Sequence, residues 1–121
     1  MYLTKSIHDG TKKHPMVGLI DAETKMTKKM TLNYTKGNVF NMCVISKGSQ
    51  NLHGHEFHFS EVTSLPKDSK FAYDLDIGKG IKNGKDGLLL YNTLASYGHL
   101  YFDSSNYARE FVSNNVKFSR S

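Results

Sequence analysis

Residues 52–60, with the sequence LHGHEFHFS, place three histidines and one glutamate within a few positions of one another and alternate in the manner of a β-strand. Successive side chains of a strand point to opposite faces. We therefore predict a strand over residues 53–59. One face of this strand carries Glu56 and His58, and the other face carries the remaining large side chains: His53, His55, Phe57 and Phe59.

The three histidines are candidate metal ligands, but their spacing does not favour a local metal site. The zinc-protease pattern is His-Glu-x-x-His on a helix, whereas residues 55–58 are one residue shorter and lie in strand-like sequence. His58 also points away from His53 and His55. A metal would need ligands from distant segments, so we expect this chain to bind neither a metal nor a cofactor.

Glu56 and His58 are neighbours on one strand face, so the carboxylate can accept a hydrogen bond from the imidazole and fix its tautomer. This pairing is typical of general acid–base catalysis that acts on a substrate or a thiol. A hydrogen-bonded pair that merely satisfies buried polar groups is the alternative interpretation, and the strand pattern leaves both open.

Outward from this strand, the sequence predicts mainly further strands. The apolar or alternating segments are residues 16–20, 39–45, 71–77 and 88–91. Glycines between residues 78 and 87 predict a turn. Residues 1–7 predict instead the last turns of a helix, because Leu3 and Ile7 are four positions apart and Gly10 follows.

A second helix is predicted near the C-terminus. Asp103, Ser104 and Ser105 offer capping side chains. An apolar stripe at helical spacing follows them, formed by Tyr107, Ala108, Phe111 and Val112. We expect Tyr107 and Phe111 to lie in the core.

Composition indicates a single globular domain of 121 residues with a formal charge of +5. The excess charge comes almost wholly from lysine, and no aromatic residues are interspersed among the lysine pairs as a nucleic-acid stacking surface would require. We therefore expect solvated lysines and no nucleic-acid partner. No apolar window is long enough for a membrane span, and residues 1–8 lack a secretory pattern.

Cys43 is the sole cysteine, which fits a reducing compartment, and we predict a cytoplasmic protein. Bulky apolar residues flank it and no glycine lies within residues 41–45. A catalytic thiol needs a sharp turn that exposes it, so we predict a buried, unreactive thiol here.

Two motifs support a family resemblance, and the first of them lies within the histidine-rich strand. Residues 54–60, GHEFHFS, closely resemble the G-H-E-F-H-Y-S motif of cobyrinate a,c-diamide synthases, and residues 92–102, NTLASYGHLYF, are similar to their N-x-x-A-S-Y-x-H-x-x-F motif. Phe59 departs from the usual tyrosine. The second motif contains Ser96, Tyr97 and His99.

The resemblance extends toward the N-terminus. Residues 16–23, MVGLIDAE, and residues 26–29, MTKK, look like the family's V-G-L-I-P-A-E followed by M-T-K-R, with Asp21 in place of proline. The motifs occur in the family's order. They imply an α/β, flavodoxin-like class I glutamine amidotransferase domain, present here as a strand-rich C-terminal portion with a C-terminal helix.

In this family, a cysteine hydrolyses glutamine, and the ammonia is passed to carboxylates that ATP and magnesium activate. The substrates are anionic tetrapyrroles: cobyrinate on the way to cobalamin, or nickel sirohydrochlorin on the way to coenzyme F430. Acetate side chains a and c become amides. Carried over by motif, His99 matches the histidine that activates the cysteine and protonates the departing ammonia.

The resemblance leaves the residue that orients His99 unassigned. Glu56 is our candidate for this role, and His58 is a further candidate catalytic residue; both lie in a family motif with Gly54, His55 and Ser60. Tyr101 occupies the position where many class I amidotransferases have a glutamate.

The family's nucleophile lies in a G-x-C-G-G-L-M-Y-L elbow, and residues 1–3 look like the end of that elbow. We therefore expect residues 1–121 to form one partial amidotransferase domain that is inactive alone. Its partners would be a nucleophile-bearing segment and an ATP-binding synthetase domain, and an exposed sheet edge would favour a homodimer. A non-catalytic relic or binding module that retains the histidine motifs is the alternative.

Overall fold

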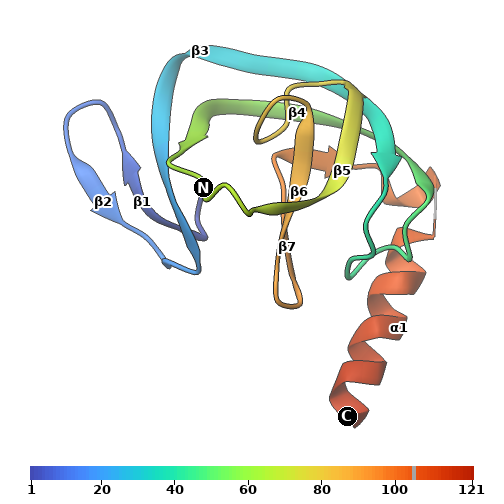
Figure 1. The fold of residues 1–121 in the computed structure, drawn as a ribbon. Helices are drawn as coiled ribbons and strands as arrows, with labels where there is room; N and C mark the ends of the chain where they lie inside the picture. Colours follow the sequence, from blue (N-terminus) through green and yellow to red (C-terminus); the bar gives the residue numbers. More distant parts are fainter. Residues whose placement is uncertain (105) are drawn as a thin grey trace.

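The computed structural model describes residues 1–104 and 106–121 and shows, within these residues, one sheet of eight strands and a C-terminal α-helix (Figure 1). The elements are β1 (Thr4–His8), β2 (Lys13–Pro15), β3 (Ile20–Val39), β4 (Gln50–Thr63), β5 (Lys70–Ile77), β6 (Lys85–Leu90), β7 (Thr93–Ala95), β8 (Gly98–Leu100), the 3₁₀ turn η1 (Phe102–Ser104) and α1 (Tyr107–Arg120). The sheet order is β2-β1-β3-β5-β6-β7, and β4 joins β3 to β8.

Strand β3 connects the parts of the sheet. It pairs in parallel with β1 and antiparallel with β4 and β5. The register with β4 shifts between Met26 and Thr31. This irregularity in the pairing is a point at which both strands can bend. Gly37 allows β5 to approach, because a Cβ at this position would overlap the carbonyl oxygen of Asp74. Figure 1 shows β3 and β4 running side by side across the top of the molecule.

The buried side chains form two apolar clusters. One cluster lies where β3, β4, β5 and the start of α1 meet and contains Val39, Cys43, Ile45, Leu52, Ala72, Tyr73 and Tyr107. The other lies where β3, β5 and β6 meet and contains Ile20, Ala22, Phe71 and Leu88. Cys43 is buried, and burial raises the pKa of its thiol. The prediction of a buried thiol is therefore confirmed.

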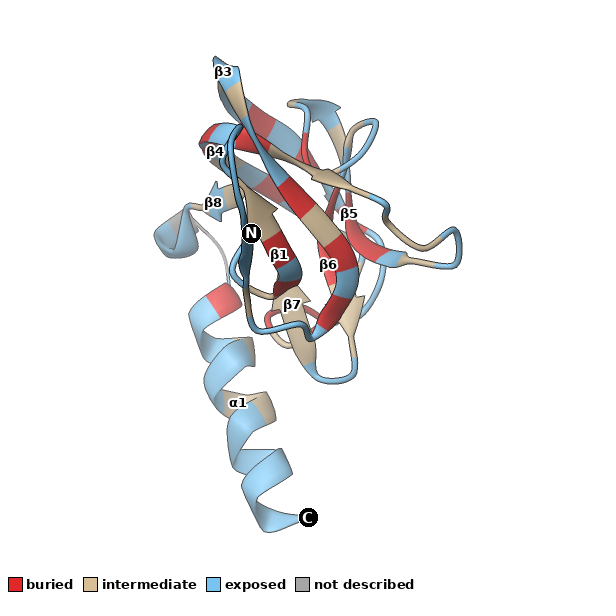
Figure 2. Cartoon of the chain, turned by 90° about the vertical axis from the view of Figure 1, so that its left-hand side faces the viewer, coloured by how far each residue is buried: buried red, intermediate tan, exposed pale blue. Residues whose placement is uncertain are grey.

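Helix α1 is attached to the sheet mainly through its first turn. The buried Tyr107 donates a hydrogen bond from its hydroxyl to the Asn51 carbonyl at 2.7 Å, and the Asn114 amide donates to the Val44 carbonyl. Figure 2 shows the rest of the helix extending from the sheet with exposed residues. The predicted helix is confirmed, but the expectation that Phe111 lies in the core is wrong, because this side chain is 47% exposed.

The helix start also differs from the prediction. Asn106 occupies the N-cap position and makes no side-chain capping hydrogen bond. Asp103 and Ser104 belong to η1, one turn earlier, and Ser105 lies outside the described residues.

The predicted helix at residues 1–7 is wrong, because residues 4–8 form β1. A spacing of four positions between Leu3 and Ile7 is an even number, so it fits one face of a strand as well as a helix. Hydrogen bonding to β2 and β3 selects the strand. The predicted strand at residues 16–20 is also largely wrong, since only Ile20 belongs to a strand.

The predicted central strand at residues 39–45 ends at Val39. Beyond it the chain turns, with the Phe40 N–H bonded to the Ala72 carbonyl and an isolated bridge between Cys43 and Ser46. Cys43 and Ile45 are buried by packing in the first cluster rather than by sheet pairing, whereas Phe40 and Met42 are exposed. The strands predicted at residues 53–59 and 71–77 are confirmed, and the one at 88–91 is confirmed as far as Leu90.

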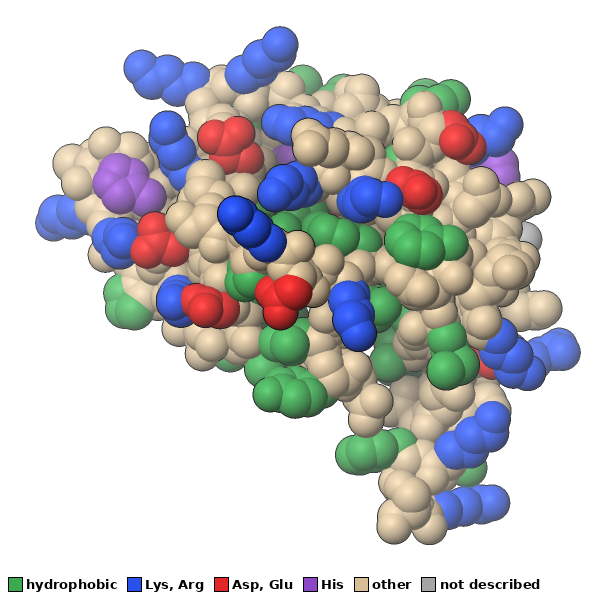
Figure 3. Space-filling model, viewed as in Figure 1, with side chains coloured by type: hydrophobic (Ala, Val, Ile, Leu, Met, Phe, Trp, Pro, Cys, Tyr) green, Lys and Arg blue, Asp and Glu red, His purple; other side chains and the backbone are tan. Residues whose placement is uncertain are grey.

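Lysine and arginine side chains are spread over the whole face seen in Figure 3, with acidic side chains between them. Exposed ion pairs join Lys5 to Asp21, Lys13 to Glu23 and Lys85 to Asp74. Among the described residues, no helix has the length and apolar character needed to cross a membrane.

Candidate active site

The alternation predicted for β4 is present in the structure. Leu52, Glu56, His58 and Ser60 are buried, whereas His53, His55, Phe57 and Phe59 are exposed. The inward face therefore places a carboxylate, an imidazole and a hydroxyl in succession within the protein. A buried polar group must find partners, and each of these three does.

Glu56 is fully buried and surrounded by hydrogen-bond donors. Its carboxylate accepts from the backbone N–H groups of Lys79 at 2.5 Å and Gly80 at 3.0 Å, and from the side-chain amide of Asn33 at 2.8 Å. Burial raises the pKa of Glu56, but these hydrogen bonds and the contact with His58 together outweigh burial, so the net pKa is lowered. Glu56 is therefore held as a carboxylate that fixes the loop after β5.

His58 lies between Glu56 and Ser60 and contacts both residues. Its Nδ1 lies 2.8 Å from the Ser60 carbonyl oxygen and its Nε2 lies 3.2 Å from Glu56 Oε2. A carbonyl and a carboxylate only accept hydrogen bonds, so each ring nitrogen of His58 faces an acceptor. The ring stacks on that of Tyr97, with centroids 3.8 Å apart, and the Tyr97 hydroxyl lies 2.9 Å from Ser60 Oγ.

Asp86 is a second buried carboxylate, and the sequence analysis missed it. Only 1% of its surface is exposed, and its two oxygens accept from the backbone N–H groups of Tyr97 at 3.1 Å and Gly98 at 2.8 Å. Burial raises its pKa, and these N–H groups offset the rise only in part. The signal that could have found it is an acidic residue two positions before the apolar run at residues 88–90, where a buried carboxyl group needs internal donors.

His99 lies on β8, and its side chain is exposed. It is opposite His55 in the antiparallel register with β4, and the two imidazole rings stack with centroids 5.0 Å apart. Gly54 allows this approach, because a Cβ at position 54 would overlap the His99 carbonyl oxygen. The Ser96 hydroxyl donates to the Gly98 carbonyl at 2.8 Å and closes the turn that precedes His99.

The structure thus divides the predicted residues into two groups. Glu56, His58, Ser60 and Tyr97 meet in the interior, whereas His55 and His99 meet on the exposed face. Glu56 is opposite Gly98 rather than His99, and adjacent positions on a strand point to opposite faces. Glu56 and His99 therefore lie on opposite faces of the paired strands. A role of Glu56 in orienting His99 stays a prediction, and it would have to act without direct contact.

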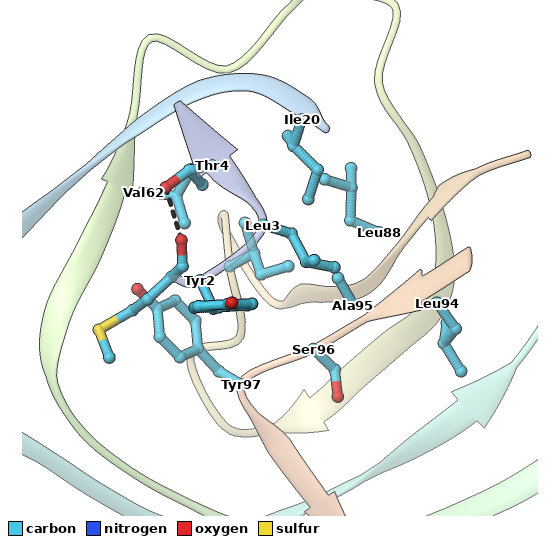
Figure 4. A pocket seen from close by; sticks show the side chains of 12 residues that line it. Tyr2, Leu3, Thr4, Ile20, Val62, Leu88, Leu94, Ala95, Ser96 and Tyr97 are labelled. Atoms are coloured by element: carbon cyan, nitrogen blue, oxygen red, sulfur yellow. Dashed lines mark hydrogen bonds between the residues drawn. The ribbon is translucent and has the colours of Figure 1, made fainter. Parts of the chain in front are cut away.

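Within residues 1–104 and 106–121, no group of three or more His, Cys, Asp or Glu side chains has a metal-binding arrangement. A cavity of about 390 Å³ lies beside the turn that carries Tyr97. Figure 4 shows Tyr2, Ser96 and Tyr97 on one side of it and Ile20 and Leu88 on another. Its lining is mainly apolar, with hydroxyls from the two tyrosines, Thr4 and Ser96 as the polar groups.

The class of domain follows from this arrangement together with a family comparison. Residues 1–107 match the model of the CobB/CobQ-like glutamine amidotransferase domain, so the chain belongs to this family. The predicted fold class is confirmed as a sheet-dominated α/β structure with one C-terminal helix that forms part of such a domain.

Curated relatives bear more particular names. The chain is 43% identical over 105 residues to a cobyrinate a,c-diamide synthase of Sulfurisphaera tokodaii, covering 87% of this chain and 24% of that protein. It is 38% identical over 133 residues to the Methanosarcina barkeri synthase, covering 99% and 26%. It is 37% identical over 119 residues to the Methanocaldococcus jannaschii synthase, covering 98% and 25%. The chain spans about a quarter of the length of these relatives.

Proposed function

We propose that this chain contributes the histidine half of the glutaminase site of a cobyrinate a,c-diamide synthase. His99 would take the proton from a cysteine thiol, and the thiolate would attack the carboxamide of glutamine. The imidazolium would then protonate the departing ammonia. The observation that carries this proposal is that the His99 ring is exposed while the backbone around it is held by β4 and by Asp86.

The nucleophile is proposed to come from a segment other than residues 1–121. Cys43 is the sole cysteine of the chain, and it is packed among apolar side chains with its thiol pKa raised by burial. Such a thiol is poorly suited to attack. The exposed face of His99 can instead receive a thiol from another part of a complete synthase.

The ammonia would be used for ATP- and magnesium-dependent amidation of tetrapyrrole acetate side chains a and c. The names of the relatives, which are cobyrinate a,c-diamide synthases, favour cobyrinate as the acceptor, and nickel sirohydrochlorin is the second acceptor to assay. ATP and magnesium would bind to a synthetase domain rather than to this chain.

A chimera tests the proposal. The segment of the M. barkeri synthase that matches this chain is replaced by residues 1–121, and release of ammonia from glutamine is measured. We expect activity, and a roughly 10²- to 10⁴-fold loss in His99→Asn. His53→Asn, which changes another exposed histidine of the same region, is the matched control and should leave activity unchanged.

Full glutaminase activity in His99→Asn would exclude the proposed role of this residue. A chimera that folds, as judged by circular dichroism and cooperative melting, but releases no ammonia would favour the non-catalytic relic.

A further inference from the structure

We propose that Asp86 is a positioning residue for His99: its buried carboxylate binds the backbone of Tyr97 and Gly98 and so sets the place and direction of the strand that presents the imidazole. This inference rests on the proposed glutaminase function. It assigns a role to a residue that none of the recognised motifs contains.

The contact geometry favours positioning over a generic stabilising role. Each carboxylate oxygen of Asp86 accepts from one of two consecutive N–H groups, at 3.1 Å for Tyr97 and 2.8 Å for Gly98. Two hydrogen bonds from consecutive N–H groups to the two oxygens of one carboxyl group fix an orientation as well as a distance. Because peptide units are planar, few free dihedrals separate the bound Gly98 N–H from the His99 side chain.

Gly98 lacks the side chain that would crowd this contact. A Cβ at position 98 would lie 3.0 Å from the nearer Asp86 oxygen, a distance that forces the carboxylate or the turn to move. The next residue is His99, in register with His55. The backbone of β8 is therefore held by β4 along its length and by Asp86 where it begins.

The side chain of Tyr97 is held independently. Its ring stacks on His58 and its hydroxyl contacts Ser60, while its N–H binds Asp86. Glu56 binds a different loop through the N–H groups of Lys79 and Gly80. The interior thus contains two buried carboxylates that each bind a pair of consecutive N–H groups, and the pair bound by Asp86 leads directly to His99.

The test compares Asp86→Asn with Asp74→Asn in the chimera. Asp74 lies on the neighbouring strand β5, where its carboxylate is 62% exposed and pairs with Lys85. Active sites are titrated with an electrophilic glutamine analogue that alkylates the thiol. We expect Asp86→Asn to lower kcat per titrated site by roughly 10- to 100-fold with little change in KM for glutamine. Asp74→Asn should match the parent.

A purely structural role for Asp86 would reduce the number of titratable sites and the melting temperature but leave kcat per site within about twofold, and that result would overturn the proposal. If Asp86→Asn does not fold, Gly98→Ala decides instead, because it displaces the turn while keeping the carboxylate. An unchanged kcat per site in a folded Gly98→Ala would likewise overturn the proposal.

NMR separates this inference from the proposed function. In the 121-residue chain, Asp86→Asn should shift the amide signals of Tyr97 and Gly98 and the ring signals of His99, whereas Asp74→Asn should not. Shifted His99 signals combined with full activity of His99→Asn would retain the positioning role and reject the glutaminase role. Unshifted signals would reject the positioning role whatever His99 does.

Discussion

Two buried carboxylates of this chain are shifted in opposite directions, although each is bound by backbone N–H groups. Glu56 has four partners, namely two N–H groups, an amide and an imidazole, and its net pKa is lowered. Asp86 has fewer partners and lies near the charge of Glu56, so burial dominates and its pKa is raised. The balance between burial, which raises the pKa, and hydrogen-bond donors, which lower it, therefore decides the sign of the shift.

Glu56→Gln should destabilise the chain by roughly 1–3 kcal/mol at neutral pH, because a donor NH₂ replaces one acceptor oxygen. The folded pKa of Glu56 lies below its ordinary value of 4.5, so its contribution to stability is present above pH 4.5 and is lost as the pH falls through the folded pKa. Urea unfolding at several pH values measures this. The stability gap between the parent and the variant should close in acid.

Asp21→Asn is the matched control, since this carboxylate is exposed and its pair with Lys5 contributes little. A gap between parent and Glu56→Gln that stays constant across the acid range would contradict the assignment of the ionised form to Glu56. Asp86 acts in the opposite sense, since a raised pKa means that its contribution declines as the pH rises.

At the scale of elements, the pairing of β4 with β8 depends on one small residue. Gly54 is opposite Leu100, and a Cβ at position 54 would overlap the His99 carbonyl oxygen. Strand β8 is three residues long, so few hydrogen bonds resist its displacement. The glycine of the histidine motif is thus needed for close backbone approach rather than for chemistry.

Gly54→Ala should destabilise the chain by about 1–3 kcal/mol, as overpacking does, and should separate β8 from β4. The expected signature is faster amide hydrogen exchange at His99 and Leu100 and a weaker nuclear Overhauser effect between the His55 and His99 rings. Phe57→Ala, at an exposed position of the same strand, serves as control. Unchanged exchange at His99 in Gly54→Ala would refute the close approach.

At the scale of the whole molecule, an apolar area is exposed on the outer side of β3 and β4. Leu32 is opposite Phe57 and Tyr34 is opposite His55, and these side chains are largely exposed. Phe57 and Phe59 contact each other edge to face on the same side. We call the residues Leu32, Tyr34, Phe57 and Phe59 the outer patch. Contiguous apolar surface of this kind favours association.

We expect the 121-residue chain to self-associate with increasing concentration in sedimentation velocity experiments. The double variant Leu32→Lys/Phe57→Lys should remain monomeric, because burying a charge in the contact is costly. Val112→Lys changes an equally exposed apolar residue on α1 and should associate like the parent. A parent chain that sediments as one monomeric species at every concentration would refute this prediction.

The local sequence pattern was sufficient to predict strand β4, helix α1 and the family. A period of two indicates the strand, a period near 3.6 indicates the helix, and short motifs indicate the family, and each of these signals is a property of neighbouring residues. The pattern predicted that Glu56 and His58 share one face of β4 and that Cys43 is buried. It misassigned residues 1–7, where the spacing fits both periods and pairing with distant β3 makes the choice.

The positions of His99 and Asp86 depend on contacts between segments that are far apart in the chain. Asp86 binds N–H groups eleven and twelve residues later, and His99 meets His55 through pairing of β8 with β4. Neither contact leaves a periodic signal, since backbone donors exist at almost every residue and only folding selects which of them a buried carboxylate receives. The sequence pattern also does not give the register of β8 with β4. It therefore suggested Glu56 as the partner of His99, whereas the register places these two side chains on opposite faces.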